Sequence, residues 1–212
     1  MQPQLQTGIG IAAEIRDRIL SYVYPPGTTL SIRKLAQELK VSTTPIREAL
    51  LRLEAEGLVD RSPNNSARVA EITYRDYHDV FPLRLVLARQ SAQLAAQRIS
   101  PSELAECDEL LAQMKDVEDF HSVNRIDLQL HSILYAASRN QFLQRAFVYI
   151  RFQATYAYGL GAQQRVLADQ MYEEWCAILD ALRASDGARA ANLIESHVQR
   201  SVEELQRLTH VS

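Results

Sequence analysis

VSTTPIREAL, at residues 41–50, is the stretch that decides the fold of the first third of this chain. Apolar residues recur at helical spacing on both sides of residues 40–42, which predicts two short helices that each bury one face. These positions are Ile32, Leu35, Ala36 and Leu39 in the first helix and Ile46, Ala49, Leu50 and Leu53 in the second. The connection is short enough to be a tight turn, so the stretch predicts a helix-turn-helix.

The second helix of this pair begins with polar residues. Ser42 or one of the next two threonines can cap the helix, and Pro45 falls in the first turn, where its missing N–H costs nothing. In a helix-turn-helix this end of the second helix enters the major groove. Thr43, Thr44 and Arg47 have the size and chemistry to reach phosphates and base edges, so we predict that they bind DNA.

Two short strands are predicted after this helix. Gly57 is a typical residue for the position just past a helix C-terminus. Residues 58–61 and 67–70 have strand character, and the turn-forming run SPNNS lies between them at residues 62–66. A hairpin in this place is the wing of a winged helix-turn-helix.

These motifs together resemble the winged-helix domain of the GntR family of bacterial transcription regulators. The resemblance rests on YPPGTTLS at residues 24–31, PIREAL at 45–50 and EGLV at 56–59. It implies that double-stranded operator DNA is the partner and that Arg33 and Arg47 are the leading DNA contacts.

The chain departs from the pattern of that family at three positions. The family usually has Arg at the position of Thr43, and Gly at the positions of Lys40 and of Asn64 near the wing tip. Asn64 tolerates a positive φ and is our fifth candidate DNA-binding residue. Lys40 in a left-handed conformation would cost roughly 1 kcal/mol.

Composition and charge favour two domains. The 212 residues are 47% hydrophobic, enough for a sizeable core, and we predict domains at residues 1–72 and 73–212. The first carries nine Lys and Arg against eight Asp and Glu, and the second fourteen against eighteen. Because so weak a positive charge binds DNA poorly by itself, we expect a homodimer that presents two copies.

Cysteine usage and hydropathy indicate the compartment. Cys107 and Cys176 are the only cysteines and have no metal-type spacing, and no secretory leader or long apolar run is present. We therefore expect a cytoplasmic protein with no disulfide framework and no membrane partner.

The remaining sequence has the periodicity of helices. A helix over residues 8–24 should pack against the helix-turn-helix. Beyond it we predict a mainly α protein, with an all-α bundle of about six helices following the winged domain. The expected segments are residues 75–98, 101–119, 122–138, 140–159, 163–184 and 187–209. Ser100 and Glu103 form a predicted capping box, and Pro82 should kink or shift the first of these helices.

Few residues of the bundle carry recognisable ligand chemistry. Asp127 and His131 stand four apart on one predicted helix, as two ligands of one metal ion can, although such a pair is more often solvated or hydrogen-bonded. His197 is a third candidate, on an apolar face of the last helix, where a lone histidine is usually a satisfied core residue.

The run DLQLHSILYAASRN at residues 127–140 resembles a signature of the FCD domain, the ligand-binding domain of the FadR branch of the GntR family. The resemblance implies a divalent transition metal, zinc or nickel, held by one Asp and three His. Asp127, His131 and His197 match three of the ligands, and Trp175 stands at the fourth. Arg84 matches an arginine typical of the first helix of that domain. The resemblance also implies a small carboxylate effector, for which Arg84 and Trp175 are the candidate binding residues.

Trp175 leaves two possibilities open, because an indole N–H is a donor only and cannot bind a cation. Either three protein ligands still hold a metal, with water or an effector carboxylate completing the shell, or the site is metal-free and Trp175 fills part of the pocket.

The leading hypothesis is a transcription regulator, a repressor rather than an enzyme, whose operator affinity changes with a small organic acid. One alternative is a winged-helix adaptor whose bundle only dimerises. The other is a metal-dependent hydrolase, since an open three-ligand site can activate water. No second histidine or glutamate stands close in the sequence as a general base, which argues against the hydrolase.

Overall fold

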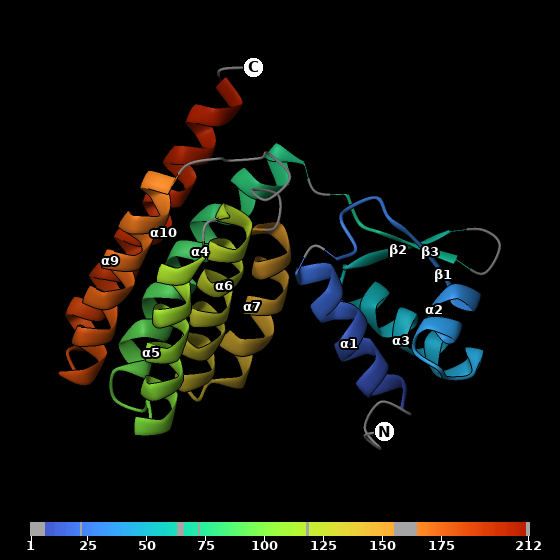
Figure 1. The fold of residues 1–212 in the computed structure, drawn as a ribbon, viewed down its shortest axis with the longest axis horizontal. Helices are drawn as coiled ribbons and strands as arrows, with labels where there is room; N and C mark the ends of the chain where they lie inside the picture. The colour runs from blue at the N-terminus through green and yellow to red at the C-terminus, as the bar shows by residue number, and fades with distance from the viewer. Residues whose placement is uncertain are drawn as a thin grey trace. The chain divides into compact units, whose positions relative to one another are not determined.

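The chain forms two compact units, Met1–Tyr74 and Arg75–Ser212. The computed structural model describes residues 7–21, 23–62, 66–71, 73–117, 119–154 and 165–210. Unit 1 holds three helices and a small sheet, and unit 2 is built of helices in its described part (Figure 1). The prediction of a mainly α chain with an N-terminal winged helix-turn-helix and an all-α second domain is confirmed.

Unit 1 is a winged helix-turn-helix. Its sheet is antiparallel in the order β1-β3-β2, and β2 and β3 form the hairpin that the sequence predicts as a wing. The brief first strand pairs with β3, with Leu30 opposite Ala67. Its elements are α1 (Gly8–Leu20), β1 (Thr29–Ser31), α2 (Ile32–Glu38), α3 (Thr43–Ala55), β2 (Val59–Ser62) and β3 (Ser66–Val69).

The apolar face of α3 packs into the core of unit 1. Ile46, Ala49, Leu50 and Leu53 are all buried, as their spacing predicts, and α1 packs against this helix. Helix α1 ends at Leu20 rather than at the expected residue 24; Ser21 is its C-cap and Val23 is exposed. Burial of one face of α3 fixes which of its residues face solvent.

Lys40 ends the turn before α3 in a left-handed conformation, with φ 55°. Its side chain is exposed. A left-handed backbone costs a residue with a Cβ about 1–2 kcal/mol, while Gly loses roughly 0.5–1 kcal/mol more entropy on folding. We therefore expect Lys40→Gly to raise the free energy of unfolding by about 0.5–1 kcal/mol.

Urea denaturation followed by circular dichroism measures this difference. Lys40→Ala is the matched control, because it removes the same charged side chain but keeps the Cβ and the strain. A Lys40→Gly protein no more stable than Lys40→Ala would show that the backbone at this turn is not strained.

Unit 2 contains the six predicted helices. The described elements are α4 (Tyr74–Ala95), α5 (Pro101–Asp116), α6 (Phe120–Ala137), α7 (Gln141–Ala154), α9 (Arg165–Arg183) and α10 (Gly187–His210). In Figure 1 they stand side by side, and α5 packs against both α6 and α9 while α9 packs against α10. Pro82 lies inside α4, which continues through it. The last residues of the expected 140–159 segment lie outside the described part of the chain.

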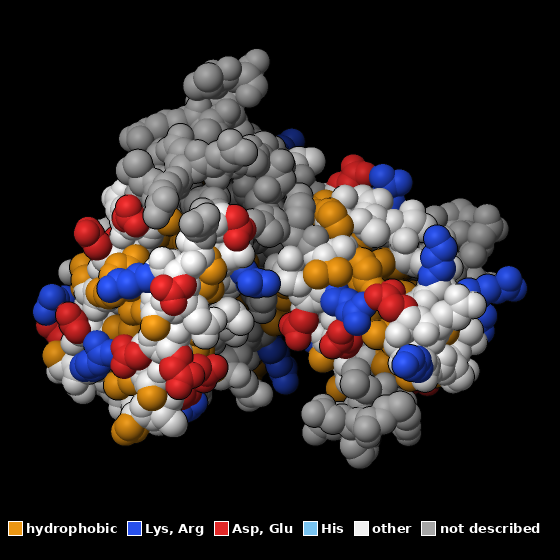
Figure 2. Space-filling model, in the orientation of Figure 1, with side chains coloured by type: hydrophobic (Ala, Val, Ile, Leu, Met, Phe, Trp, Pro, Cys, Tyr) orange, Lys and Arg blue, Asp and Glu red, His pale blue; other side chains and the backbone are white. Residues whose placement is uncertain are grey.

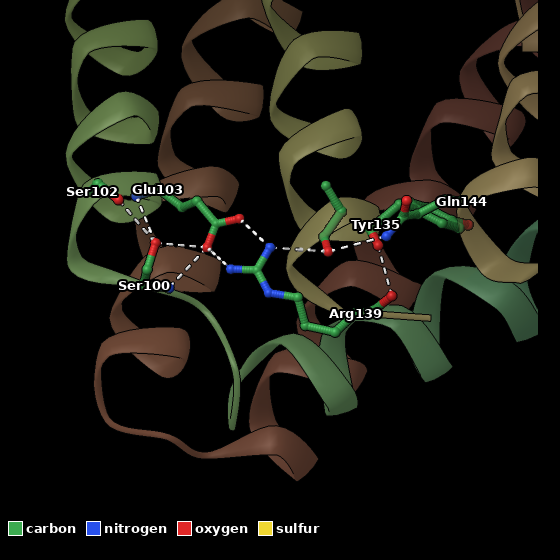
Figure 3. A network of polar contacts seen from close by, with 8 residues as sticks. Ser100, Ser102, Glu103, Tyr135, Arg139 and Gln144 are labelled. Carbon is green, nitrogen blue, oxygen red and sulfur yellow. Dashed lines mark hydrogen bonds and ion pairs between the residues drawn. The ribbon is translucent and has the colours of Figure 1, made fainter. Parts of the chain in front are cut away.

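A network of hydrogen bonds connects the start of α5 with the end of α6 (Figure 3). The predicted capping box is present: Ser100 accepts a hydrogen bond from the backbone of Glu103, and the Glu103 side chain accepts from the backbone of Ser100. Arg139 donates to both Glu103 oxygens at 2.8 and 2.6 Å, and Arg98 donates to the carbonyl of Ser138 at 2.7 Å. These bonds fix the C-terminal end of α6, the helix that carries Asp127 and His131.

The visible surface of unit 2 is mixed in charge. Figure 2 shows acidic and basic side chains interspersed over this unit, so that face offers no continuous positive surface to DNA phosphates. None of the described helices is both long enough and apolar enough to cross a membrane. Cys107 and Cys176 are both free thiols.

Candidate DNA-binding surface and candidate metal centre

The start of α3 presents the predicted DNA-binding residues to solvent. Thr43, Thr44 and Arg47 are exposed on its first two turns, and Arg33 is exposed on α2. Ser42 occupies the N-cap position but its side chain caps no backbone N–H, contrary to one of our expectations. Its hydroxyl therefore has no structural role in that cap. Asn64 lies outside the described residues, so its role stays a prediction.

Three candidate metal ligands meet inside the helical bundle. Asp127 and His131 of α6 and His197 of α10 place their ligand atoms within 4.8 Å of one another. All three side chains are buried. The Nε2 of His197 lies 3.0 Å from Oδ1 of Asp127, and the Nε2 of His131 lies 3.8 Å from Oδ2 of Asp127. Neither histidine Nε2 has a hydrogen-bond partner in the described structure.

Trp175 closes one side of this cluster. Its indole N–H donates a 2.7 Å hydrogen bond to Oδ1 of Asp127, and the ring is almost completely buried. The indole meets the ring of His131 edge-on, with centroids 5.0 Å apart and an interplanar angle of 80°. Trp175 stands at the position of the fourth metal ligand that the family resemblance implies. It donates a hydrogen bond to the candidate ligand Asp127 and cannot itself bind a cation.

The pKa values of the two histidines shift in opposite directions. Burial lowers the pKa of His131 to about 3, opposed by the carboxylate of Asp127. Burial also acts to lower the pKa of His197, but Asp127 and Glu174 outweigh it and raise that pKa above its ordinary value. Burial would raise the pKa of Asp127, yet the two imidazoles and the Trp175 N–H hold it well below its usual range. Asp127 is therefore ionised and His131 is neutral at pH 7.

Glu174 and Arg200 extend the cluster and were not among the predicted site residues. An oxygen of Glu174 lies 2.7 Å from Nδ1 of His197. Arg200 binds both Glu174 oxygens, at 2.5 and 2.6 Å. The available sequence signals were that Glu174 adjoins the fourth ligand position and that Arg200 stands three residues after His197, on the same face of α10.

Arg84 is buried beside this cluster. Its positive charge acts to lower the pKa of both His131 and Tyr135, and the guanidinium has no carboxylate partner among the described residues. The hydroxyls of Tyr135 and Ser91 are also buried, and they interact with each other. A buried cation beside buried hydroxyls is the kind of group that binds an anionic, oxygen-containing ligand.

The donor set fits a divalent transition metal. Two imidazole nitrogens and one carboxylate are ligands that zinc, nickel and iron accept, and the two Nε2 atoms without partners face the carboxylate. Buried polar atoms rarely remain without partners. Asp127, His131 and His197 can therefore hold such an ion, and Trp175 cannot contribute a fourth ligand.

The fold and these sites define a class of protein. A winged helix-turn-helix with its polar helix start exposed is joined to an all-α domain with a buried polar cluster, which is the architecture of a DNA-binding regulator with a separate ligand-binding domain.

Comparisons with known proteins give the family. Residues 8–69 match the family "Bacterial regulatory proteins, gntR family", and residues 79–200 match the FCD domain. The second match covers more than half of the chain. The chain belongs to the GntR family of bacterial transcription regulators and carries an FCD domain.

Curated relatives agree with this assignment. The Nta operon transcriptional regulator of Aminobacter aminovorans is 27% identical over 188 residues, which cover 88% of each chain. The gluconate operon transcriptional repressor of Bacillus subtilis is 26% identical over 212 residues, covering 94% of this chain and 86% of the repressor. The Escherichia coli regulator McbR is 34% identical over 107 residues, 48% of each chain.

Solved structures share the fold. The structure of E. coli McbR/YncC matches with a TM-score of 0.85 at 22% identity, covering 98% of this chain and 99% of that one. A GntR regulator from Rhodococcus sp. RHA1 matches with a TM-score of 0.75 at 22% identity, over 94% and 97% of the two chains. These two matches show the shared fold, while the role as a transcription regulator with a DNA-binding domain and an effector-binding domain rests on the family matches and the curated relatives.

Proposed function

We propose that this regulator is a cytoplasmic, homodimeric repressor, not an enzyme, whose affinity for operator DNA is modulated by a small carboxylate bound near a metal ion. The observation that carries the proposal is the convergence of Asp127, His131 and His197 within the bundle, with the two histidine Nε2 atoms 3.0 and 3.8 Å from the oxygens of Asp127. The relative from B. subtilis is named a repressor, which supports the same role here.

The DNA side of the proposal depends on the exposed start of α3. Arg47 and Thr44 would contact base edges or phosphates in the major groove, and Thr43 would lie beside them. Arg33 would contact the DNA backbone. Asn64 would contact an adjacent groove as part of the wing. A dimer would place one copy of α3 on each half of a near-palindromic operator.

The effector side depends on Arg84 and the candidate metal centre. Asp127, His131 and His197 would hold zinc or nickel, and a bound ion would supply Lewis-acidic positions for a carboxylate oxygen. Arg84, a buried cation without an acidic partner in the described structure, would pair with the same carboxylate. Trp175 would form one wall of the pocket. Ligand binding would then shift the populations of DNA-binding and non-binding states.

The homodimer is supported by exposed apolar side chains on two neighbouring helices. Leu83 and Val86 stand three residues apart on α4 and are largely exposed, as are Phe142 and Tyr149, seven apart on α7. The inner faces of the same two helices share the small cluster that contains Leu87 and Leu143. Clusters of exposed apolar residues on a soluble protein mark interaction surfaces, and a second copy of the chain is our proposed partner.

A fluorescence titration tests the effector side. Trp175 is the only tryptophan and touches the candidate centre, so its emission should change when Zn²⁺ or Ni²⁺ binds and again when the correct acid is added from a carboxylic-acid library. Elemental analysis of the purified protein supplies the metal content. Metal-free protein with no response to any metal or acid, and with an unchanged His131→Ala variant, would overturn the proposed sensor.

That negative result would instead favour the adaptor, whose bundle only dimerises. The hydrogen bond from Trp175 to Asp127 is the observation in its favour, because it satisfies part of the cluster without any metal. A hydrolase has less support. Glu174 is the acidic group next to the cluster, and its oxygens are already engaged by Arg200 and His197, so it is a poor general base.

A further inference from the structure

The candidate metal centre has a second layer of polar contacts that joins α9 to α10. Glu174 on α9 contacts two residues of α10. Its Oε2 lies 2.7 Å from Nδ1 of His197, and Arg200 donates hydrogen bonds to both of its oxygens. The Glu174 side chain is 23% exposed and the Arg200 side chain 17%. Two charge-assisted bonds in a fork hold a carboxylate in one orientation more firmly than a single contact does.

The chemistry of Glu174 decides which nitrogen of His197 carries a hydrogen. Both oxygens of Glu174 accept hydrogen bonds from the Arg200 guanidinium, at 2.5 and 2.6 Å, which is the geometry of an ionised carboxylate. An ionised carboxylate only accepts hydrogen bonds. Nδ1 of His197 must therefore be the donor in this 2.7 Å contact.

The other nitrogen of His197 is directed into the candidate centre. Nε2 lies 3.0 Å from Asp127 Oδ1 but makes no hydrogen bond in the described structure. With Nδ1–H committed to Glu174, Nε2 is the nitrogen available to a cation. Contacts of this kind orient metal-binding histidines and raise their basicity.

We propose that Glu174, anchored by Arg200, is a positioning residue that holds His197 with Nδ1–H toward Glu174 and Nε2 toward Asp127 and His131. The inference rests on the metal site of the proposed function. It goes beyond that site because it assigns the affinity for the ion in part to two residues that do not touch it.

Zinc affinity measured by competition with a chromophoric chelator is the first test. Glu174→Ala should weaken Zn²⁺ binding roughly 10- to 100-fold, the range typical of lost outer contacts. Glu174→Gln keeps a carbonyl oxygen that accepts from Nδ1–H and should recover much of that loss. Arg200→Met should give a smaller loss than Glu174→Ala, since the carboxylate remains but is no longer anchored.

Glu195→Ala is the matched control. Glu195 also lies on α10 and forms an ion pair between helices, with Arg89 of α4, but it has no contact with the cluster. Its loss should leave Zn²⁺ affinity unchanged. Equal affinity in wild type and Glu174→Ala would overturn the proposal.

The second test detects the imidazole N–H of His197 directly by NMR and needs no metal. In protein labelled with ¹⁵N-histidine, the Nδ1–H of His197 should give a downfield, slowly exchanging proton signal. The signal should be lost in Glu174→Ala and kept in Glu174→Gln. A signal that persists in Glu174→Ala would overturn the positioning role even if that variant were less stable.

The two tests separate this inference from the proposed function. If the wild-type protein binds no metal, the proposed metal site fails, and the imidazole signal still decides whether Glu174 orients His197. If the wild type binds Zn²⁺ and Glu174→Ala binds it equally well, the metal site stands and the positioning role fails.

Discussion

Arg47→Ala should lower the affinity for operator DNA by roughly 1–3 kcal/mol per half-site, and a dimer that uses both half-sites should lose about twice that. Arg47 is exposed on the second turn of α3, and its neighbours Ile46 and Ala49 point into the core. The side chain is therefore held on the outer face of the helix without a structural role in packing. The operator fragments for this experiment are those that the wild-type protein selects from a random duplex pool.

Gel-shift titrations across a series of salt concentrations distinguish two kinds of contact for Arg47. Loss of a phosphate contact weakens binding uniformly across sequences and reduces the salt slope by about 1, whereas loss of a base contact relaxes specificity at one position. Either result supports the proposed interface. Affinity that ignores salt, or that is unchanged in Arg47→Ala, would remove it.

Arg52→Ala is the control on the same helix. Arg52 is also exposed, but it lies five residues nearer the C-terminus of α3, about 7.5 Å further along the axis. Because only the start of the second helix enters the groove, this variant should bind nearly as well as wild type. Equal losses for Arg47→Ala and Arg52→Ala would indicate a general effect of charge.

Local patterns predicted the fold well because they act within one element. The spacing of Ile46, Ala49 and Leu53 specified the buried face of α3, and the Ser100–Glu103 capping box specified the start of α5. The resemblance to the GntR family, whose pattern has Gly at the position of Lys40, correctly indicated a left-handed residue. Arg139 is a second left-handed residue, with φ 53°, and we did not anticipate it.

The candidate site was less accessible to sequence reasoning because it is made between helices. Spacing alone paired Asp127 with His131, since both belong to α6. His197 was only a lone histidine on an apolar helix face until the resemblance to the FCD family implied that it is a ligand. Glu174 and Arg200 meet only because α9 packs against α10, a contact that no periodicity within either helix specifies. The sequence indicated that the indole N–H of Trp175 can only donate, and in the structure it donates to Asp127.

Substitution of Trp175 should have the largest effect on the bundle. Trp175→Phe keeps most of the ring but removes the N–H from a buried, ionised carboxylate, which should cost about 1–3 kcal/mol of unfolding free energy. Trp175→Ala also leaves a cavity and should cost roughly 3–5 kcal/mol or more. Urea denaturation followed by circular dichroism measures both, since the only tryptophan is gone. Tyr172→Phe, one turn earlier on α9 and only half-buried, is the control and should change stability by no more than about 0.5 kcal/mol.

Trp175→His tests what the same position does to metal binding. An imidazole there would add a fourth ligand to Asp127, His131 and His197, the set that the resemblance to the FCD family implies. We expect calorimetric titration to show tighter Zn²⁺ binding than in wild type and a stability that rises with added metal, because an ion that binds only the folded protein stabilises it. Trp175→Phe separates this gain from the loss of the indole, since it removes the N–H without adding a ligand. If Trp175→His bound Zn²⁺ no more tightly than Trp175→Phe, residue 175 would not face the ion, and the three-ligand site would have to be placed elsewhere around Asp127.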